Sequence, residues 1–134
     1  MRDQEEKLLR AAAEARKQAY CPYSGYAVGA AVLTGEEDIV SGCNVENASY
    51  GLSNCGERTA IFKAVSRGAK RIKAVAITGA GEMPYPCGAC RQVMAEFAES
   101  REMPVYVALV SETGEIDKIE RYTLEQLLPH SFTL

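Results

Sequence analysis

The segment that decides the fold is IKAVAITGAGEMPYPCGACRQVMAEFAESREMPVYVALV, residues 72–110. It begins with a short apolar strand from Ile72 to Thr78 and continues through a loop from Gly79 to Pro86. A helix is indicated from about Cys87 to Glu99, and a second apolar strand follows from Val105 to Val110. Because a helix joins the two strands, we expect part of the sheet to be parallel.

The segments on either side add further helices and strands. The helices that they predict are Asp3–Ala19, Cys55–Arg67 and Thr123–Leu128, and the strands are Val28–Thr34, Asp38–Gly42 and Ile116–Glu120. The first two of these strands flank a turn and form an antiparallel hairpin, and residues 43–54 then form a polar loop. The chain therefore predicts a single domain over residues 1–134, a three-layer α/β/α sandwich around a mixed sheet of about five strands.

The composition is that of an ordinary globular protein. Among the 134 residues, 47% are apolar and 25% are charged, and the formal net charge is −3. The densest basic stretch, residues 70–73, is short, so we expect no nucleic acid polymer as substrate. No apolar run is long enough to span a bilayer, and the charged segment Met1–Lys7 is unlike a signal peptide. We therefore expect a cytoplasmic protein that does not bind membranes.

Three of the five cysteines lie in two short fragments, residues 55–58 (CGER) and 86–90 (PCGAC). Five thiols cannot all pair within one chain, and clustered cysteines in a reducing compartment indicate metal binding or catalysis. Both fragments fall where a loop becomes a helix, and the positive end of a helix dipole favours thiolates. Cys55, Cys87 and Cys90 therefore form one site if the two helix starts converge. Three ligands and an open position are typical of a catalytic zinc, so we predict one zinc per chain.

The residues around this site suggest how the zinc would be used. The only histidine, His130, lies far along the chain, so water would take the open position and become a source of hydroxide near neutral pH. Glu57, two residues after Cys55, is placed to accept the water proton and deliver it to a leaving amine. The alternative role of Glu57 is that of a first-turn acid that suits the helix dipole.

Arg58 is placed to offset the negative charge of the predicted zinc site. Three thiolates around Zn²⁺ leave a net negative site, which opposes the formation of bound hydroxide. We interpret Arg58 as a donor that withdraws charge from a thiolate. A solvated arginine on a helix surface is the alternative.

Two other interpretations of the cysteines remain open. Cys87 and Cys90 alone match a thioredoxin-like redox pair, which leaves Cys55 unexplained. A structural zinc would need a fourth thiolate, for which Cys43 is a better candidate than Cys21. We expect Cys21 and Cys43 instead to be small buried residues.

The two fragments resemble the signature of the small homotetrameric zinc-dependent cytidine deaminases, in the form Cys-x-Glu followed by Pro-Cys-x-x-Cys. The likeness covers nearly the whole chain and includes residues 22–24, 28–30, 42–48, 90–93 and 127–129. It implies hydrolytic deamination of cytidine or deoxycytidine to uridine or deoxyuridine, with release of ammonia, in pyrimidine salvage. It also implies a homotetramer with shared active sites.

The resemblance implies substrate contacts at seven positions. Tyr26 would lie beside the nucleoside, and the backbone N–H of Gly56 would donate to the pyrimidine carbonyl. An amide and a carboxylate, Asn44 and Glu46, would bind the ribose hydroxyls. The remaining contacts would come from a neighbouring subunit, and they are Ala48, Tyr50 and Phe132.

Departures from the family pattern leave the substrate open. Tyr26 stands where the family usually has Phe, Gly56 stands where it has Ala, and His130 and Ser131 replace small apolar residues. A sister deaminase of a modified cytosine nucleoside or an aminopyrimidine antibiotic is therefore an alternative. A structural zinc module that binds a partner protein is a further alternative from a different class.

Overall fold

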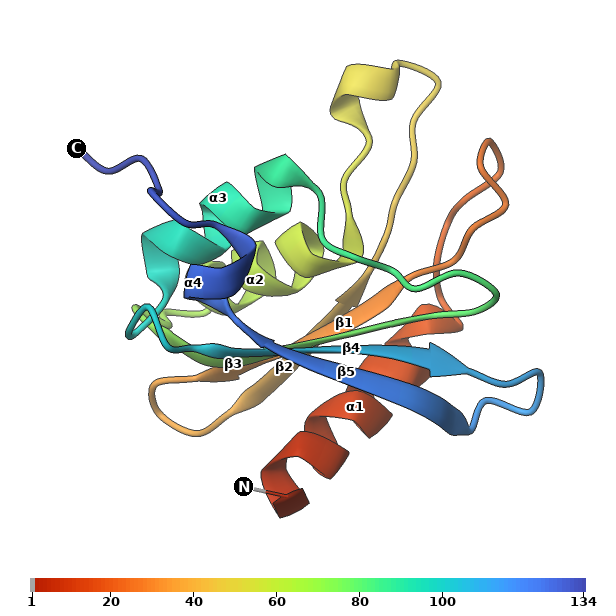
Figure 1. The fold of residues 1–134 in the computed structure, drawn as a ribbon. Coiled ribbons are helices and arrows are strands. Elements are labelled where there is room, and N and C mark those ends of the chain that lie inside the picture. The colour runs from red at the N-terminus through yellow and green to blue at the C-terminus, as the bar shows by residue number, and fades with distance from the viewer. Residues whose placement is uncertain (1) are drawn as a thin grey trace.

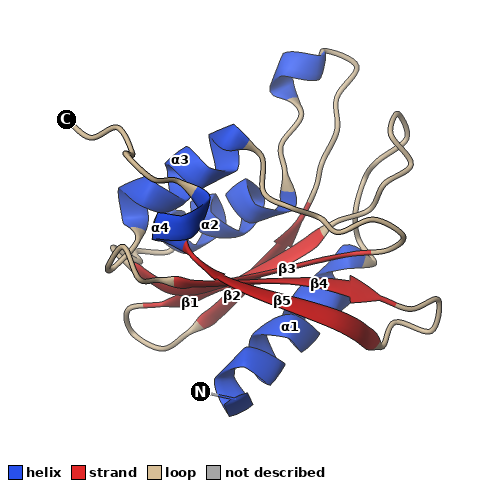
Figure 2. Ribbon diagram, viewed as in Figure 1, coloured by secondary structure: helices blue, strands red, loops and turns tan. Residues whose placement is uncertain are grey.

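The computed structural model describes residues 2–134, which form one five-stranded sheet with helices on both faces (Figures 1 and 2). The strands are β1 Gly29–Thr34, β2 Ile39–Cys43, β3 Ile72–Gly79, β4 Pro104–Val110 and β5 Ile116–Thr123. The helices are α1 Arg2–Arg16, the 3₁₀ helix η1 Tyr50–Leu52, α2 Gly56–Ser66, α3 Gly88–Phe97 and α4 Leu124–Leu127. No helix among these residues is long and apolar enough to cross a membrane.

The sheet is mixed, with the strand order β2-β1-β3-β4-β5. The strands β3 and β4, which α3 connects, are parallel, whereas the other neighbouring pairs are antiparallel. Helix α1 covers one face, and α2, α3 and α4 lie on the other (Figure 1). The predicted three-layer sandwich around a five-stranded mixed sheet is confirmed.

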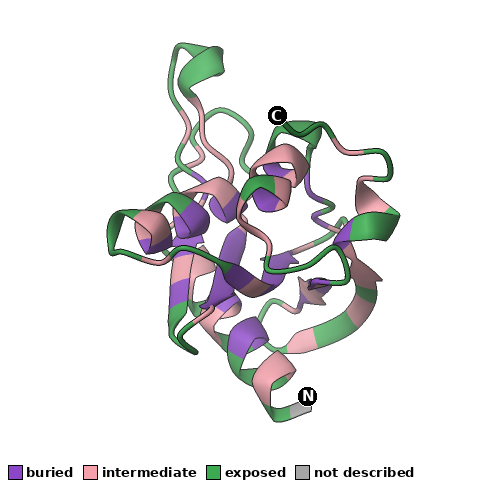
Figure 3. Ribbon diagram, turned by 90° about the vertical axis from the view of Figure 1, so that its left-hand side faces the viewer, coloured by how far each residue is buried: buried purple, intermediate pink, exposed green. Residues whose placement is uncertain are grey.

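Buried residues lie on the strands and on the helices beside them (Figure 3). The side chains of the central strands alternate between two apolar cores. On β3, Val75 and Ile77 face α2 and α3, while Ala74 and Ala76 face α1. Because both faces of β1, β3 and β4 are covered, these strands have the nearly continuous apolar sequence expected of buried strands.

Two glycines allow the helices to approach the sheet closely. A Cβ at Gly29 would overlap the carbonyl oxygen of Ala12 and lie 2.6 Å from the amide nitrogen of Arg16, both backbone atoms of α1. A Cβ at Gly42 would lie 2.7 Å from the amide nitrogen of Ala60 in α2. Backbone cannot move aside as a flexible side chain can, so these positions set the spacing of all three layers.

We therefore expect Gly29→Ala to lower the free energy of unfolding by about 1–3 kcal/mol, as overpacking of a tight core does. Urea unfolding followed by circular dichroism measures this. Gly51→Ala is the matched control, because nothing lies within 4 Å of a Cβ there. Equal stability of the two variants would show that α1 moves away at little cost.

Helix ends differ from the prediction where long-range hydrogen bonds intervene. Helix α1 ends at Arg16 rather than Ala19, because the amide of Tyr20 donates to the carbonyl of Asn44 and pulls the chain aside. Helix α3 ends at Phe97 because the amide of Glu99 donates to the carbonyl of Ile72. These partners lie more than 20 residues away, beyond the reach of local sequence patterns.

The predicted polar loop over residues 43–54 is more ordered than expected. Cys43 belongs to β2, and Val45 forms bridges with both Tyr20 and Asn54. These bridges close the base of an arm that projects from the fold and carries η1 at its tip (Figure 1).

Candidate metal centre and active site

The N-termini of α2 and α3 bring three thiols together. Cys55 is the N-cap of α2, Cys87 is the N-cap of α3, and Cys90 lies in the first turn of α3. The Sγ atoms of Cys55 and Cys87 are 3.7 Å apart, and those of Cys87 and Cys90 are 3.4 Å apart. Two sulfurs bound to one tetrahedral zinc lie about 3.8 Å apart, so this cluster has nearly the spacing that zinc requires.

The charges of the cluster also fit a divalent cation. Hydrogen bonds from Cys90 and Arg58 lower the pKa of the Cys55 thiol to about 5, whereas the bond with Cys55 and burial raise the pKa of Cys90. A single thiolate, that of Cys55, is thus stabilised, and the neighbouring Cys90 retains its proton. A bound Zn²⁺ removes this conflict because it stabilises all three thiolates at once.

Arg58 faces the sulfurs directly. Its Nη2 donates to the Sγ of Cys55 at 3.4 Å, and interactions with Cys55 and Cys90 raise its pKa. Its Nε is buried without a hydrogen-bond partner among the described residues, so the guanidinium has donor capacity to spare. This placement suits an arginine that withdraws charge from a thiolate.

Glu57 is a buried carboxyl group beside the thiols. Its exposed fraction is only 3%, and burial, aided by the charge of Cys55, raises its pKa to about 7. It is not part of the thiol cluster, so it lies beside the ligand set rather than in it. A carboxyl group with a pKa near neutrality is suited to both accepting and donating a proton.

The other candidate ligands lie elsewhere. Within residues 2–134, the group of side chains close enough to hold a metal comprises only Cys55, Cys87 and Cys90. Cys43 pairs with Gly29 across the hairpin, and both Cys43 and Cys21 are half-buried rather than buried as expected. His130 is exposed in the C-terminal segment. The arrangement therefore favours an open three-thiolate site over a closed four-thiolate one.

Asn44 is buried and already has structural partners. Its Oδ1 accepts from the amide of Val28, and its Nδ2 donates to the carbonyl of Tyr26, both at 2.9 Å. An amide side chain has two donors and two acceptor positions, so one of each remains for a ligand.

Glu46 is likewise partly occupied. Its Oε1 accepts from the amides of Tyr23 and Ser24 at 3.0 Å, and its Oε2 accepts from the Ser24 hydroxyl. Hydrogen bonds from Ser24 and Tyr23 lower its pKa, so the group is ionised and retains an acceptor position. It borders a hollow of about 350 Å³ together with Tyr23, Ser24, Tyr50 and Ser53.

The remaining predicted contact residues divide into two groups. Tyr26 is half-buried, and Gly56 is buried at the first position of α2. Ala48, Tyr50 and Phe132 are exposed, with 77% of Tyr50 and 68% of Phe132 accessible. The ring of Tyr50 contacts Tyr23 of its own chain, with ring centroids 6.2 Å apart.

Arg91 is a residue at this site to which the sequence assigned no role. Its Nε donates to the carbonyl of Pro86 at 2.8 Å, and its Nη1 donates to the carbonyl of Leu127 at 2.7 Å. It thus ties the residue before Cys87 to the end of α4. The sequence signal available for it was its position directly after Cys90, in the first turn of a helix, from which no contact was predicted.

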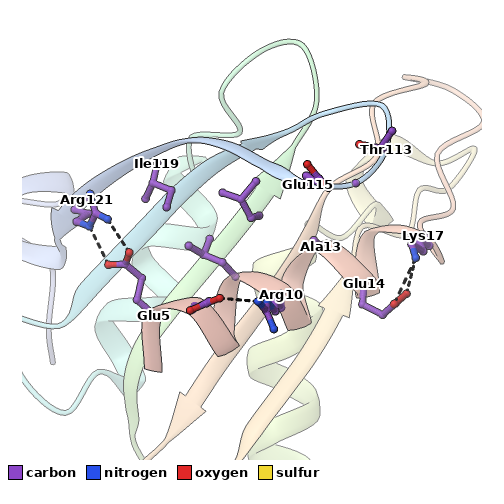
Figure 4. Close-up of a pocket in the computed structure, with 13 residues that line it drawn as sticks. Glu5, Arg10, Ala13, Glu14, Lys17, Thr113, Glu115, Ile119 and Arg121 are labelled. Carbon is purple, nitrogen blue, oxygen red and sulfur yellow. Dashed lines mark hydrogen bonds and ion pairs between the residues drawn. The ribbon is translucent and has the colours of Figure 1, made fainter. Parts of the chain in front are cut away.

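A larger hollow, of about 730 Å³, lies between α1 and β5 (Figure 4). Its walls carry ion pairs between Arg121 and Glu5, Arg10 and Glu6, and Lys17 and Glu14. No cysteine lines it, and six of its seven charged side chains are joined in these surface ion pairs. The thiol cluster, rather than the larger hollow, is therefore the candidate catalytic site.

Three converging thiols and a buried carboxyl group, carried by an α/β/α sandwich, are features of a zinc-dependent enzyme. Residues 2–107 match the family model "Cytidine and deoxycytidylate deaminase zinc-binding region". Cytidine deaminase from Sporosarcina psychrophila is 50% identical over 129 residues, which are 96% of this chain and 90% of that protein. The chain therefore belongs to the cytidine and deoxycytidylate deaminase family.

Further comparisons show the range of the family. The structure of cytidine deaminase from Burkholderia pseudomallei is similar with a TM-score of 0.85 and 41% identity, covering 95% of this chain and 98% of that one. Blasticidin-S deaminase from Bacillus cereus is 30% identical over 118 residues, which are 79% of this chain and 76% of that protein.

Proposed function

We propose that this chain catalyses the hydrolytic deamination of cytidine and deoxycytidine to uridine and deoxyuridine, with release of ammonia. The observation that carries the proposal is the buried Glu57 carboxyl group beside three thiols spaced for zinc. The higher identity to a cytidine deaminase, 50% against 30% for the blasticidin-S deaminase, favours a simple cytosine nucleoside as substrate.

Cys55, Cys87 and Cys90 hold the metal in this proposal. A bound zinc would act as a Lewis acid and would lower the pKa of water at this site toward neutrality. The Glu57 carboxylate accepts one proton from water as the oxygen bonds to C4, and delivers it to the ring nitrogen. It then takes the second proton from the new hydroxyl group at C4 and delivers it to the amine, which leaves as ammonia. Arg58 holds the Cys55 sulfur through its hydrogen bond and offsets part of the negative charge of the thiolates.

The substrate contacts follow from the groups that remain available. Asn44 and Glu46 each keep hydrogen-bonding capacity for a ribose hydroxyl. The amide of Gly56, at the N-terminus of α2, donates to the pyrimidine carbonyl. The ring of Tyr26 forms one wall beside the nucleoside.

A substrate panel tests the function. Purified protein with zinc is mixed with cytidine, deoxycytidine, an N4-substituted cytidine and blasticidin S, and both the ultraviolet absorbance and ammonia are followed. We expect the first two to be converted with one ammonia per product. Turnover of blasticidin S alone would assign the chain to the antibiotic, and zinc binding without any turnover would support a structural module.

The active sites are proposed to be shared in a homotetramer. Phe132 and Tyr50 expose large apolar rings, and an assembly would remove that surface from water. Phe132 lies beyond α4, where Gln92 fixes its carbonyl through a hydrogen bond of 3.1 Å. Its ring is thus free to enter a neighbour's pocket and stack on a flat pyrimidine.

Phe132→Ala is accordingly expected to raise KM about tenfold or more, as loss of a buried interface aromatic does. Leu134→Ala is the matched control on the same exposed segment, and it should leave KM unchanged. Mixing Phe132→Ala with Glu57→Gln chains should restore activity above that of either parent after subunit exchange. No recovery, with exchange confirmed by mass spectrometry, or an active monomer would contradict shared sites.

The proposed location of the protein is the cytoplasm, and its proposed substrates are free nucleosides. The five cysteines are free within residues 2–134, and three of them are arranged for metal, which fits the reducing cytoplasm. The acidic net charge of −3 disfavours a nucleic acid polymer as substrate. A single deaminase domain acting on free nucleosides accounts for these features.

A further inference from the structure

The loop over residues 80–87 delivers Cys87 to the metal site, and three hydrogen bonds from other parts of the chain hold it. The Arg91 side chain donates to the carbonyl of Pro86, as described above. The hydroxyl of Tyr85 donates to Oε1 of Glu120 on β5 at 2.7 Å. The third bond runs from the hydroxyl of Tyr26 to the carbonyl of Glu82.

The Tyr26 bond joins two loops that are far apart in the sequence. Tyr26 lies between α1 and β1, whereas Glu82 lies between β3 and α3, 56 positions further along the chain. Burial and the charge of Glu82 raise the pKa of the Tyr26 phenol, so its proton stays available for donation. This residue, proposed above as a wall of the nucleoside site, thereby contacts the loop that carries a metal ligand.

Gly79 provides the space for this contact. A Cβ at position 79 would lie 2.5 Å from the Tyr26 hydroxyl oxygen and 3.0 and 3.1 Å from Cβ and Cγ of Pro84. The φ angle of Gly79 is not in the left-handed region, so its backbone conformation does not require glycine. The requirement at this position is steric, and it arises from the hydroxyl of Tyr26 and the ring of Pro84.

We propose that the Tyr26 hydroxyl is a positioning group that fixes the 80–87 loop, and with it Cys87, through the carbonyl of Glu82. One consequence is that the aromatic wall of the nucleoside site and the metal-binding loop are held as one unit. Gly79 is part of the same arrangement, because a side chain there would push the Tyr26 hydroxyl away from the carbonyl of Glu82. The proposal rests on the proposed function only in its account of the nucleoside wall.

Tyr26→Phe removes the hydrogen bond and keeps the ring. We expect zinc to transfer to an excess of a coloured chelator about threefold to tenfold faster, the effect of losing one ordinary hydrogen bond. Hydrogen exchange at the amides of Gly81, Glu82 and Met83 should rise as well. Tyr20→Phe is the matched control, since Tyr20 lies in the same loop and is 55% exposed.

A double-mutant cycle separates positioning from a direct contact with substrate. Gly79→Ala alone should lower kcat and accelerate zinc release, because its methyl group meets the Tyr26 hydroxyl. Adding Tyr26→Phe should restore part of kcat and slow zinc release again, because the clash with the hydroxyl is removed. Recovery should be incomplete because Pro84 still limits the space. If the two substitutions caused independent structural defects, their effects would add and the double variant would be worse than either single variant. Recovery in the double variant therefore indicates that the two positions interact.

The outcomes decide between the two roles. A change in KM alone for Tyr26→Phe, with normal zinc release, normal exchange and no recovery in the double variant, would overturn the proposal and make the hydroxyl a substrate contact. If Gly79→Ala does not fold, exchange and zinc release in Tyr26→Phe decide. A wild-type protein without cytidine turnover would refute the proposed function, while these two measurements would still test the loop.

Discussion

Glu57→Gln is expected to retain the fold and one zinc per chain but to lose activity by a factor of at least about 10²–10⁴ in kcat. The amide preserves the shape of the side chain, yet it cannot accept the proton of water or protonate the departing amine. The loss is expected to exceed that of a single transfer, because the proposed mechanism uses this carboxyl group more than once. Initial rates with cytidine and metal analysis of the same sample measure both properties.

Glu96→Gln provides the control for Glu57→Gln. It makes the same chemical change at an exposed position of α3 and should leave kcat unchanged. Near-normal turnover by a folded Glu57→Gln protein would remove Glu57 from the mechanism. Loss of zinc in that variant would instead make the carboxyl group part of the metal site.

Cys87→Ala is expected to abolish stable zinc binding, and cytidine turnover with it. Two remaining thiolates leave the metal with too few protein ligands, because even catalytic sites use three. Cys87 is exposed at the N-terminus of α3, so its loss removes a ligand without opening a cavity in the core. Metal analysis after gel filtration should show less than one tenth of the wild-type zinc.

Cys43→Ala is the matched control, because Cys43 lies at the end of β2 outside the thiol cluster. It should retain full zinc and activity. Full zinc occupancy in Cys87→Ala, or loss of zinc in Cys43→Ala, would contradict the ligand set.

Much of the fold could be predicted from local patterns. The apolar runs of β1, β3 and β4 are distinct because both faces of these strands are buried. The helix between two such strands gave their parallel pairing. Helix ends were predicted less well, since Tyr20 and Glu99 leave helical geometry to pair with distant strand and loop residues.

The metal cluster was predictable because its ligands lie close to two recognisable helix starts. Cys87 and Cys90 are three residues apart, and Cys55 occupies the equivalent N-cap of another helix. The convergence of those two helices depends on the whole sheet, and only the structure gives the distances between the sulfurs.

The hydrogen bonds within the proposed substrate pocket were not predictable. The side chain of Asn44 forms hydrogen bonds with backbone groups of Tyr26 and Val28, which are at least 16 positions away. The carboxylate of Glu46 accepts hydrogen bonds from the amides of Tyr23 and Ser24. Such contacts depend on the conformations of two loops that local propensities do not define. Hydrogen bonds of this kind give the polar loop defined partners in distant parts of the chain.

The central claim is that two helix N-termini create an open three-thiolate zinc site for catalysis. X-ray absorption at the zinc edge of the purified protein tests it most directly, because sulfur and oxygen or nitrogen neighbours differ in distance and scattering. We predict three sulfurs at about 2.3 Å and one lighter neighbour at about 2.0–2.2 Å. Four sulfur neighbours would contradict the claim, because they would define a closed structural site with no position for the reaction.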